Sequence, residues 1–263
     1  FNSAYSSFSL DFDAGSSDYI DCTNSSILKP TSAYSISGWF KLNNLTGTKT
    51  IISNDNNNGY MVWVAGSNLV FYHWDSTWRT ITSNTTLSAN VWYNFVVTWD
   101  LSNTTGKIYI NGQFDKQYTQ FGQITYNSSD PVYIGTYGPS HYFDGKIDEI
   151  SIFNKTLNQA EITSIYNNGY PKDITALSPI SWWRLGEDAY FNGNDFIVPN
   201  QITGAPNGTS NAMPATALVA DAPGSYAAGL GSSLALADRV GDAPNSTANS
   251  LSFNMTPENR ISY

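Results

Sequence analysis

The sequence contains little of what disulfides, metal clusters and cationic binding surfaces require. Its 263 residues include one cysteine and two histidines. One cysteine excludes an internal disulfide, and cysteine-rich zinc modules and iron–sulfur clusters need several. Lys and Arg number 12 against 21 Asp and Glu, which gives a net charge of −9. Because surfaces that bind nucleic acids or anionic membranes are rich in positive charge, we expect neither as a partner.

Charged residues and long apolar runs are also scarce. Asp, Glu, Lys and Arg make up 13% of the chain, about half the usual ~25%, so Asn, Ser, Thr and Gly must solvate much of the surface. No apolar run reaches the ~18 residues that a membrane-spanning helix needs, so we expect no membrane insertion. Hydrophobic residues still reach 41% and aromatic residues 14%, which is enough for a sizeable core.

Residues 1–170 show the pattern of short β-strands. Apolar and polar residues alternate along 35–42 and 60–64, and clusters of Asn, Asp and Gly separate such runs. Asn-Gly at 111–112 predicts a hairpin, since both turn residues need a positive φ. In 158–168 the apolar residues recur at helical spacing before Gly and Pro, which predicts one short helix. The many short strands predict a sandwich or a barrel.

The composition changes after Pro171. Residues 203–250 are mostly Ala, Gly, Ser, Pro, Asn and Asp, and such a stretch buries too little apolar area to offset its ordering entropy alone. We therefore predict a domain at 1–170 and an irregular extension at 171–263. Either the domain or neighbouring chains would hold the extension in place, and we favour neighbouring chains.

The extension repeats a pattern from the start of the chain. Leu10-x-Phe12 recurs as Leu251-x-Phe253, and in both copies an Ile lies ten residues after the Leu. One explanation is that two alternating strands resemble each other by chance. The other is that the extension is a partial second unit of the same type, which pairs with the sheet edge of another chain.

Motifs along residues 8–166 occur in the order found in laminin-G-like domains. Trp92–Asp100 reads WYNFVVTWD and resembles the central strand of these domains. The other matching segments are 8–20, 37–40, 107–112, 143–150 and 157–166. The chain is thus similar to the laminin-G-like members of the concanavalin A-like lectin/glucanase superfamily. The resemblance implies an all-β, two-sheet antiparallel jelly-roll sandwich that binds glycans or proteins, often with calcium, and some relatives are hydrolases.

Three segments of the extension resemble structural proteins of marine tailed phages. They are 181–187, 239–245 and 250–254. This resemblance implies a place on the virion surface, with neighbouring copies or other virion proteins as partners. Because adjacent residues of a strand point to opposite faces, one of Trp182 and Trp183 should face outward. The candidate assembly residues are Trp182, Trp183, Leu251 and Phe253.

The sequence offers no catalytic constellation. Hydrolases of this fold that resemble laminarinases carry carboxylates in alternation on one strand, so that a pair of them lies about 5–5.5 Å apart. Asp148 and Glu149 are adjacent and are expected to point to opposite faces, as are Glu187 and Asp188. No Gly-x-Ser-x-Gly motif marks a serine nucleophile. We therefore predict no catalytic residue and no enzymatic activity.

Calcium is the one cofactor that the sequence suggests. The loop 54–59 is dense in oxygen ligands, with Asp55 and Asn57 as the candidate metal ligands. Pentraxin-like relatives carry calcium ligands at this place, and a polar turn is the alternative. Those relatives also need carboxylates just after a strand that corresponds to 132–135, where this chain has none. A structural calcium is also conceivable near four other acidic residues, and the alternative is that their side chains are solvated. These residues are Asp11, Asp13, Asp144 and Asp148.

Aromatic residues in two predicted loops suit a binding surface. By strand alternation Trp39, Trp92 and Trp99 belong to the core, whereas loop aromatics beside polar groups suit ligand contact. The candidates for contact with a glycan or a partner are Trp74, Trp78, Arg79, Tyr137, His141 and Tyr142. The alternatives are that these side chains cover hydrophobic surface or form a subunit contact.

These observations predict a non-enzymatic virion structural or decoration protein whose laminin-G-like domain serves in adhesion or in binding a host-surface glycan. One alternative is a secreted, extracellular lectin that binds carbohydrate with the help of calcium. The other is a glycoside hydrolase or polysaccharide lyase whose site the motifs do not reveal.

Overall fold

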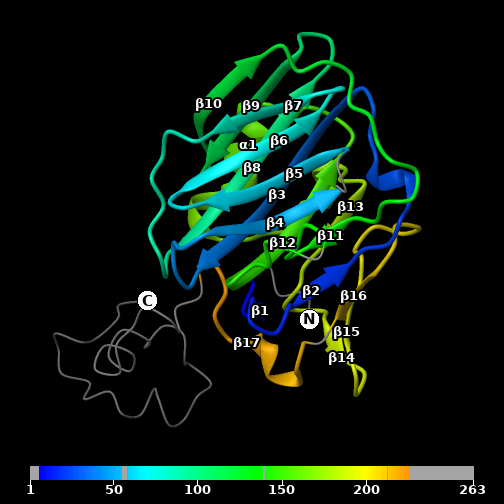
Figure 1. Ribbon diagram of the computed structural model, residues 1–263. Coiled ribbons are helices and arrows are strands. Elements are labelled where there is room, and N and C mark those ends of the chain that lie inside the picture. The colour runs from blue at the N-terminus through cyan, green and yellow to red at the C-terminus, as the bar shows by residue number, and fades with distance from the viewer. Residues whose placement is uncertain (1–5, 55–57, 139, 212, 225–263) are drawn as a thin grey trace, which may run out of the picture. The chain divides into compact units, whose positions relative to one another are not determined.

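The computed structural model describes residues 6–54, 58–138, 140–211 and 213–224. The chain divides into two units, Phe1–Gly224 and Ser225–Tyr263, and the described residues all belong to the first. In this unit two antiparallel sheets pack against each other (Figure 1), which confirms the predicted two-sheet, all-β sandwich. No helix within the described ranges has the length and apolar surface that crossing a bilayer requires.

The first sheet, sheet A, has eight strands. Its order is β10, β9, β8, β3, β12, β1 and β17, and β13 pairs with the end of β12. In chain order these strands are β1 (Ser9–Phe12), β3 (Ala33–Leu42), β8 (Trp92–Asp100), β9 (Thr105–Ile110), β10 (Gln113–Thr119), β12 (Gly145–Phe153), β13 (Ser181–Trp183) and β17 (Leu218–Val219).

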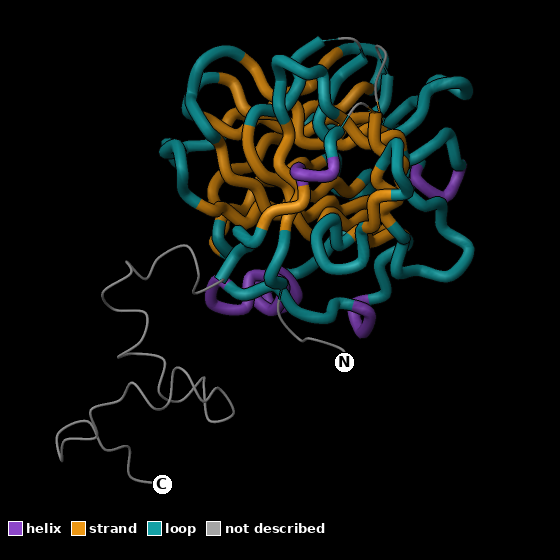
Figure 2. The backbone as a smooth tube through the Cα atoms, turned by 90° about the horizontal axis from the view of Figure 1, so that it is seen from below, coloured by secondary structure: helices purple, strands orange, loops and turns teal. Residues whose placement is uncertain are grey.

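The second sheet, sheet B, has nine strands. Its order is β14, β15, β16, β2, β11, β4, β5, β6 and β7. In chain order these strands are β2 (Tyr19–Asp21), β4 (Thr48–Asn54), β5 (Tyr60–Ala65), β6 (Asn68–Trp74), β7 (Trp78–Thr82), β11 (Tyr133–Ile134), β14 (Tyr190–Phe191), β15 (Phe196–Val198) and β16 (Gly208–Asn211). Seen from below (Figure 2), the strands stack in the interior of this unit and the loops lie around them.

Local sequence signals account for two of these features. Asn111 and Gly112 have φ values of 50° and 74° and join β9 to β10, which confirms the Asn-Gly hairpin. The predicted short helix is α1 (Gln159–Tyr166). Asn158 caps it by accepting hydrogen bonds from the backbone N–H of Ala160 and Glu161, and the Glu161 carboxylate accepts the Asn158 N–H in return. The short 3₁₀ turns are η1 (Ser26–Leu28), η2 (Asn167–Gly169), η3 (Thr175–Leu177) and η4 (Ala215–Ala217).

The main core lies between the two sheets. Alternation along β3 sends Ile36, Phe40 and Leu42 inward and Ser37, Trp39 and Lys41 outward. The largest fully buried side chains of this core are aromatic, which accounts for much of the aromatic content of the chain. They include Phe12, Tyr34, Phe40, Tyr60, Phe71, Phe95, Trp99, Phe121, Phe143, Trp183 and Phe196.

A second, smaller core covers the outer face of sheet A. Here α1 and the segment after it pack onto outward-pointing residues of β8, β9, β12 and β13. Trp39 of β3 stacks on Tyr166 at the end of α1, with 5.8 Å between the ring centroids. Trp39 therefore is buried, as predicted, although outside the main core. The members of this second core are Val96, Tyr109, Phe153, Leu157, Ile162, Ile165, Ile174 and Trp182.

Residues 171–224 form part of the sandwich, which differs from the predicted boundary after residue 170. The segment supplies β13 and β17 to sheet A and β14, β15 and β16 to sheet B. Asp221 closes the contact, because its carboxylate pairs with Lys41 Nζ at 2.7 Å and accepts a hydrogen bond from Trp92 Nε1 at 3.1 Å. Trp92 thus is half-buried at the surface of sheet A rather than in the core. The segment folds because existing strands offer it edges to pair with, which composition alone does not reveal.

Trp182 and Trp183 both serve inside the chain, which corrects their prediction as assembly residues. Trp183 points into the main core, is 0% exposed and donates from Nε1 to the Pro206 carbonyl at 3.0 Å. Trp182 points to the other face of sheet A but is only 4% exposed, because the second core covers it. Neither indole offers surface to a neighbouring subunit. The other two assembly candidates, Leu251 and Phe253, lie outside the described residues.

Candidate functional site

The outer face of sheet B carries a continuous row of aromatic side chains. Inward-pointing Val62, Val64 and Phe71 belong to the main core, so Trp63 of β5 and Tyr72 of β6 point outward. The centroids of these two rings are 4.6 Å apart, with the rings edge to face. Aromatic pairs in this arrangement stabilise each other beyond their buried area, so the two rings form a fixed platform.

The row extends from this pair in both directions. Toward β7, Trp78 lies edge to face with Tyr72 at 5.6 Å and with Trp74 at 4.9 Å. Toward β4, the His141 ring lies 5.6 Å from Trp63 and 6.0 Å from the stacked Tyr137 ring. All these distances join ring centroids. We call the six residues, Trp63, Tyr72, Trp74, Trp78, Tyr137 and His141, the aromatic face.

Two different local structures hold the ends of the aromatic face. Trp74 and Trp78 pair across the hairpin between β6 and β7, so the predicted loop is a tight turn between two strands. His141 lies beside β4, where its backbone carbonyl accepts a hydrogen bond from Thr50 N at 2.9 Å. Thr50 is itself the cross-strand partner of Trp63. The two loops that the sequence nominated separately are therefore joined through β4, β5 and β6.

Four of the six predicted ligand-binding residues belong to the aromatic face, and two do not. Tyr142 lies in a neighbouring group of rings, 6.5 Å from Tyr19, which in turn is 5.4 Å from Tyr133. Arg79 follows Trp78 in β7 and points to the opposite side of the strand. Its Nε pairs with the Asp75 carboxylate at 2.9 Å, and Asp75 also accepts a hydrogen bond from Gly122 N at 2.6 Å. Arg79 therefore has a structural partner away from the aromatic face.

Trp63 and Tyr72 are functional candidates that the sequence reasoning missed. Their signal was present in the alternation of 60–64 and 69–73, which predicts outward side chains at both positions. The other histidine, His73, alternates inward and lies in the core next to Tyr34, whose hydroxyl is 3.0 Å from His73 Nδ1. Burial lowers the pKa of His73 to about 4, so its ring is neutral at physiological pH.

The aromatic face has the chemistry of a carbohydrate platform. Five of its six residues are half-buried and His141 is exposed, although the indole Nε1 of Trp63 is buried. Trp and Tyr combine an apolar ring, on which the C–H face of a sugar can stack, with a polar group at the edge. Neither metal candidate of the 54–59 loop can be compared with this face, because Asp55 and Asn57 lie outside the described residues.

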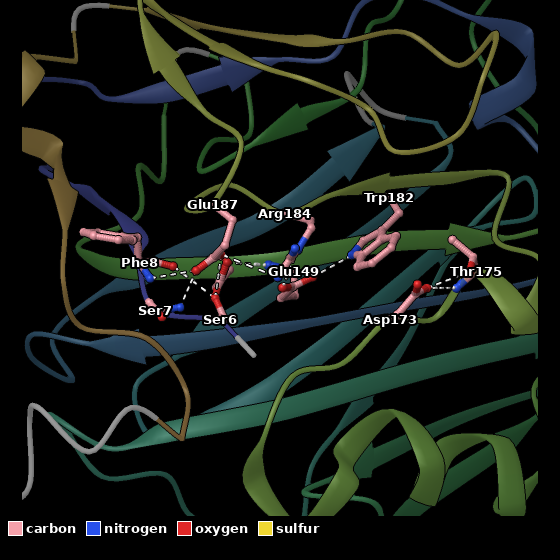
Figure 3. Close-up of polar contacts among 10 residues, drawn as sticks. Ser6, Ser7, Phe8, Glu149, Asp173, Thr175, Trp182, Arg184 and Glu187 are labelled. Atoms are coloured by element: carbon pink, nitrogen blue, oxygen red, sulfur yellow. Dashed lines mark hydrogen bonds and ion pairs between the residues drawn. The ribbon is translucent and has the colours of Figure 1, made fainter. Parts of the chain in front are cut away.

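A second cluster, on the outer face of sheet A, contains three carboxylates, of which Glu149 and Glu187 are labelled in Figure 3. Asp148, Glu149 and Glu187, which we call the acidic cluster, each offer a carboxylate oxygen within 4.8 Å of the others. This corrects the prediction that Asp148 and Glu149 point to opposite faces. The register of β12 against β3 shifts between Asp148 and Ser151, and Glu149 has a φ of 53°. Such a bulge adds one residue to the strand and lets two successive side chains share a face.

Protein donors satisfy the oxygens of the acidic cluster. Glu149 accepts hydrogen bonds from Trp182 Nε1 at 2.6 Å and from Arg184 Nε at 3.1 Å. Asp148 accepts from its neighbour's backbone N–H at 2.9 Å and from the Ser6 hydroxyl at 2.7 Å. The same Ser6 Oγ, which has one proton to donate, also lies 2.8 Å from Glu187 Oε2, and Glu187 Oε1 accepts hydrogen bonds from Phe8 N at 2.9 Å and from Ser7 N. The cluster thus fastens the segment before β1, the bulge of β12 and the segment after β13 to one another.

Burial controls the protonation of the acidic cluster. It raises the pKa of Glu149 to about 7, although Arg184 and the Trp182 N–H favour the ionised form. Burial and the neighbouring Glu149 raise the pKa of Asp148 well above its ordinary value. A cavity of only about 10 Å³ reaches Glu149, about the space of one water molecule. The cluster therefore has raised pKa values but no space there for a sugar ring.

Comparison with known proteins agrees with this architecture. The profile of the laminin-G family described as the concanavalin A-like lectin/glucanases superfamily matches residues 14–163. A search of curated proteins gave no match. Among solved structures, a proposed carbohydrate-binding protein from Bacteroides ovatus is similar with a TM-score of 0.66 and 17% identity. That match covers 83% of this chain, which spans 61% of the length of the Bacteroides protein.

Two further structures show weaker similarity. One is domain 4 of AbnA, a GH43 extracellular arabinanase from Geobacillus stearothermophilus, in complex with arabinotriose. It is 22% identical with a TM-score of 0.46, and the match covers 53% of this chain and 69% of the AbnA domain chain. The other is the CBM40 of a Ruminococcus gnavus IT-sialidase bound to α2,3 sialyllactose. It is 13% identical with a TM-score of 0.46, and the match covers 52% of this chain and 83% of the CBM40 chain. With its two-sheet sandwich and the family profile over more than half of its length, the chain belongs to the concanavalin A-like lectin/glucanase superfamily.

Proposed function

We propose that this protein binds carbohydrate, without catalysis, on the aromatic face of sheet B. The observation that carries the proposal is the unbroken row of six rings from Trp74 to Tyr137, each within 6.0 Å of the next by ring centroid. A folded β-sheet holds these rings in place before a ligand arrives, so binding costs little side-chain ordering. The fold similarity to a proposed carbohydrate-binding protein supports this function.

The charges near the aromatic face favour a neutral sugar. Arg79, the cation next to Trp78, is already paired with the buried Asp75 carboxylate. Lys49, beside Thr50 of β4, is only 5% exposed and donates from Nζ to the Asn44 side chain at 3.0 Å. Neither cation is available for a bidentate contact with a sugar carboxylate. Recognition would therefore depend on ring stacking and on hydrogen bonds to hydroxyl groups.

A glycan array followed by calorimetry tests the proposal. Trp78→Ala and His141→Ala remove one ring from each half of the aromatic face, and each should weaken the affinity at least about tenfold if both halves contact the glycan. Phe114→Ala is the matched control, because Phe114 is an exposed aromatic residue on β10 of sheet A. Unchanged affinity in both aromatic-face variants would contradict the proposal, as would an equal loss in the control. Repeating the array with EDTA shows whether calcium assists.

The absence of catalysis is part of the proposal and has its own support. Of the three clustered carboxylates that could act as acid and base, Asp148 and Glu149 are buried and Glu187 is half-buried, and all three are engaged by protein donors. A glycosidase or lyase, the competing function, requires an acid or base that touches the substrate. Turnover of any polysaccharide that the array identifies, measured by release of reducing ends, would favour that competitor.

We further propose that the protein is a structural or decoration component of a virion surface. Support comes from the similarity of 181–187 and of two later segments to marine phage structural proteins, and from a surface with few charges. Neighbouring copies or other virion proteins would then contact the chain. Light scattering of the full chain, with limited proteolysis after residue 224, tests this: a monomer with a protected C-terminal part would instead favour the alternative, a secreted lectin.

A further inference from the structure

A buried lysine and an asparagine amide meet where β4 begins. Lys49, the second residue of β4, is only 5% exposed, and its Nζ lies 3.0 Å from Oδ1 of Asn44. Asn44 lies in the connection that follows β3, and its amide nitrogen donates to Oδ2 of Asp144, which directly precedes β12. These three residues, which we call the lysine–amide site, belong neither to the aromatic face nor to the acidic cluster.

The surroundings of Lys49 make it easier for the side chain to lose its proton. Desolvation lowers the pKa of Lys49, although the nearby Asp144 acts in the opposite direction. Nζ donates to two neutral oxygens, Oδ1 of Asn44 and the carbonyl of Thr46, and forms no ion pair with a carboxylate of the described residues. The neutral amine, which such an environment favours, is the nucleophilic form of lysine.

Hydrogen bonds polarise the Asn44 carbonyl toward attack by such an amine. Besides Lys49, Oδ1 accepts from the backbone N–H of Thr46 at 3.0 Å and from the Thr46 hydroxyl at 2.6 Å. The Asn-x-Thr sequence places these two donors two residues after the amide that they bind. They stay in position when Lys49 no longer donates, so they can stabilise the negative charge that develops on Oδ1 during attack at Cγ.

Asp144 lies at the other end of the amide, beside the nitrogen that would leave. A carboxylate only accepts and an ammonium only donates, so Asp144 and Lys49 fix which end of the Asn44 amide faces each of them. Oδ1 of Asp144 is held by the side-chain N–H of Asn43 at 2.9 Å. Asp144 also lines a cavity of about 210 Å³, which has room for water and for released ammonia.

We propose that Lys49 and Asn44 join in an intramolecular isopeptide bond. Lys49 first gives one proton to solvent, and the neutral Nζ attacks Cγ of Asn44 to form the new C–N bond. The Cγ–Nδ2 bond then breaks, a second Nζ proton passes to Nδ2 through the Asp144 carboxylate, and ammonia leaves. Atoms and charges balance without an oxidant, a metal or a cofactor. The bond would tie the start of β4 covalently to the connection after β3, and it is independent of carbohydrate binding.

A second lysine–asparagine pair in the same chain is a matched control. Lys29 follows Asn24 at the same spacing in the sequence, and its Nζ donates to Asn24 Oδ1 at 2.5 Å. Asn24, however, is exposed, and its amide nitrogen donates to the Ser128 carbonyl instead of to a carboxylate. A backbone carbonyl does not carry a proton to a leaving nitrogen, so we expect this control pair to stay unlinked.

Mass spectrometry of the denatured full chain tests the proposal. The wild type should be lighter than its sequence by one ammonia, and trypsin should fail to cleave after Lys49. Fragmentation of the resulting peptide should place the loss between Asn44 and Lys49. Lys49→Arg keeps the positive charge but removes the nucleophile, so this variant should have its full mass. Asp144→Asn should lower the linked fraction at least about tenfold.

The outcomes are distinct. A loss of one ammonia that disappears in Lys49→Arg, with the control pair unmodified, supports the isopeptide bond. A wild type of full mass that trypsin cleaves after Lys49 overturns it. So does a loss that persists in Lys49→Arg, because a succinimide at Asn111-Gly112 releases the same ammonia without any lysine. The linked peptide of the wild type is direct evidence that does not depend on how well the variants fold.

Discussion

Trp182 donates a hydrogen bond from its indole Nε1 to Oε2 of Glu149, with 2.6 Å between the two atoms. The bond joins β13 to the bulge of β12 and buries a carboxylate beneath the second core. Arg184 Cζ lies 5.6 Å from the centroid of the same indole and also pairs with Glu149. One residue of the extension thus donates a hydrogen bond that favours the ionised form of a buried carboxylate in the family domain.

Glu149 should contribute less stability as the pH rises from about 4.5 to about 7, whereas His73, whose pKa burial lowers to about 4, contributes with the opposite sign. The pKa of Glu149 is raised from 4.5 to about 7, so the folded protein binds a proton that the unfolded chain has released over this range. The contribution is fully present below pH 4.5 and lost by pH 7, on the order of 3 kcal/mol. Urea denaturation at pH 5 and pH 8 measures the difference.

Glu149→Gln provides the control for this pH dependence. The variant cannot titrate at this position, so its free energy of unfolding should change less between pH 5 and pH 8. Asp148, whose pKa is also raised, contributes with the same sign. A variant whose free energy of unfolding changes between pH 5 and pH 8 by as much as that of the wild type would contradict the assignment, because His73 titrates equally in both proteins.

Trp183→Ala should destabilise the whole sandwich. In the wild type the indole is 0% exposed, lies in the main core and donates a hydrogen bond to the Pro206 carbonyl, and the substitution removes both the packing and the hydrogen bond. Removing a buried tryptophan costs about 3–5 kcal/mol, measurable as a lower denaturation midpoint. Tyr190→Ala, at an exposed position of β14 in the same extension, should cost little. Equal, small effects of both variants would indicate that the extension is peripheral to the fold.

Gly38→Ala should destabilise the protein although alanine is a small residue. A Cβ at this position would overlap Cδ1 of Ile150 and lie 2.9 Å from Cε1 of Phe95. Overpacking of this kind costs about 1–3 kcal/mol. The double variant with Ile150→Val removes the overlapping methyl group and should recover part of the loss. The midpoints of thermal unfolding of the wild type, the Gly38→Ala variant and the double variant measure both effects. The absence of recovery in the double variant would count against the steric explanation.

Arg79→Met should lower stability and leave carbohydrate affinity unchanged. The substitution removes the partner of the Asp75 carboxylate, whose side chain is only 3% exposed, and a cost of about 1–3 kcal/mol is expected. The guanidinium points away from the aromatic face, so the sugar-binding rings stay in place. Calorimetry with the glycan identified by the array, beside urea denaturation, measures both effects. A large loss of affinity with normal stability would place Arg79 in the binding site after all.

Much of the fold was predictable because its signals are local. Alternation with period two fixes which side chains of β3 enter the core, and the Asn111-Gly112 turn fixes the hairpin register. The Asn158 cap and the residues after Tyr166 set both ends of α1. The same alternation contained the outward positions of Trp63 and Tyr72, so that part of the aromatic face was legible in the sequence and was overlooked.

What only the tertiary structure decided depends on which strands become neighbours. The sequence placed Trp78 and His141 in separate loops, and the order β11, β4, β5, β6 and β7 joins them into one face. Alternation failed at Glu149, because a bulge with positive φ is stabilised by Arg184 and Trp182, which are distant in sequence. Composition alone also did not predict that residues 171–224 belong to the sandwich. A polar segment of this kind is ordered because the edges of the two sheets supply its hydrogen bonds and its few large side chains pack in the main core.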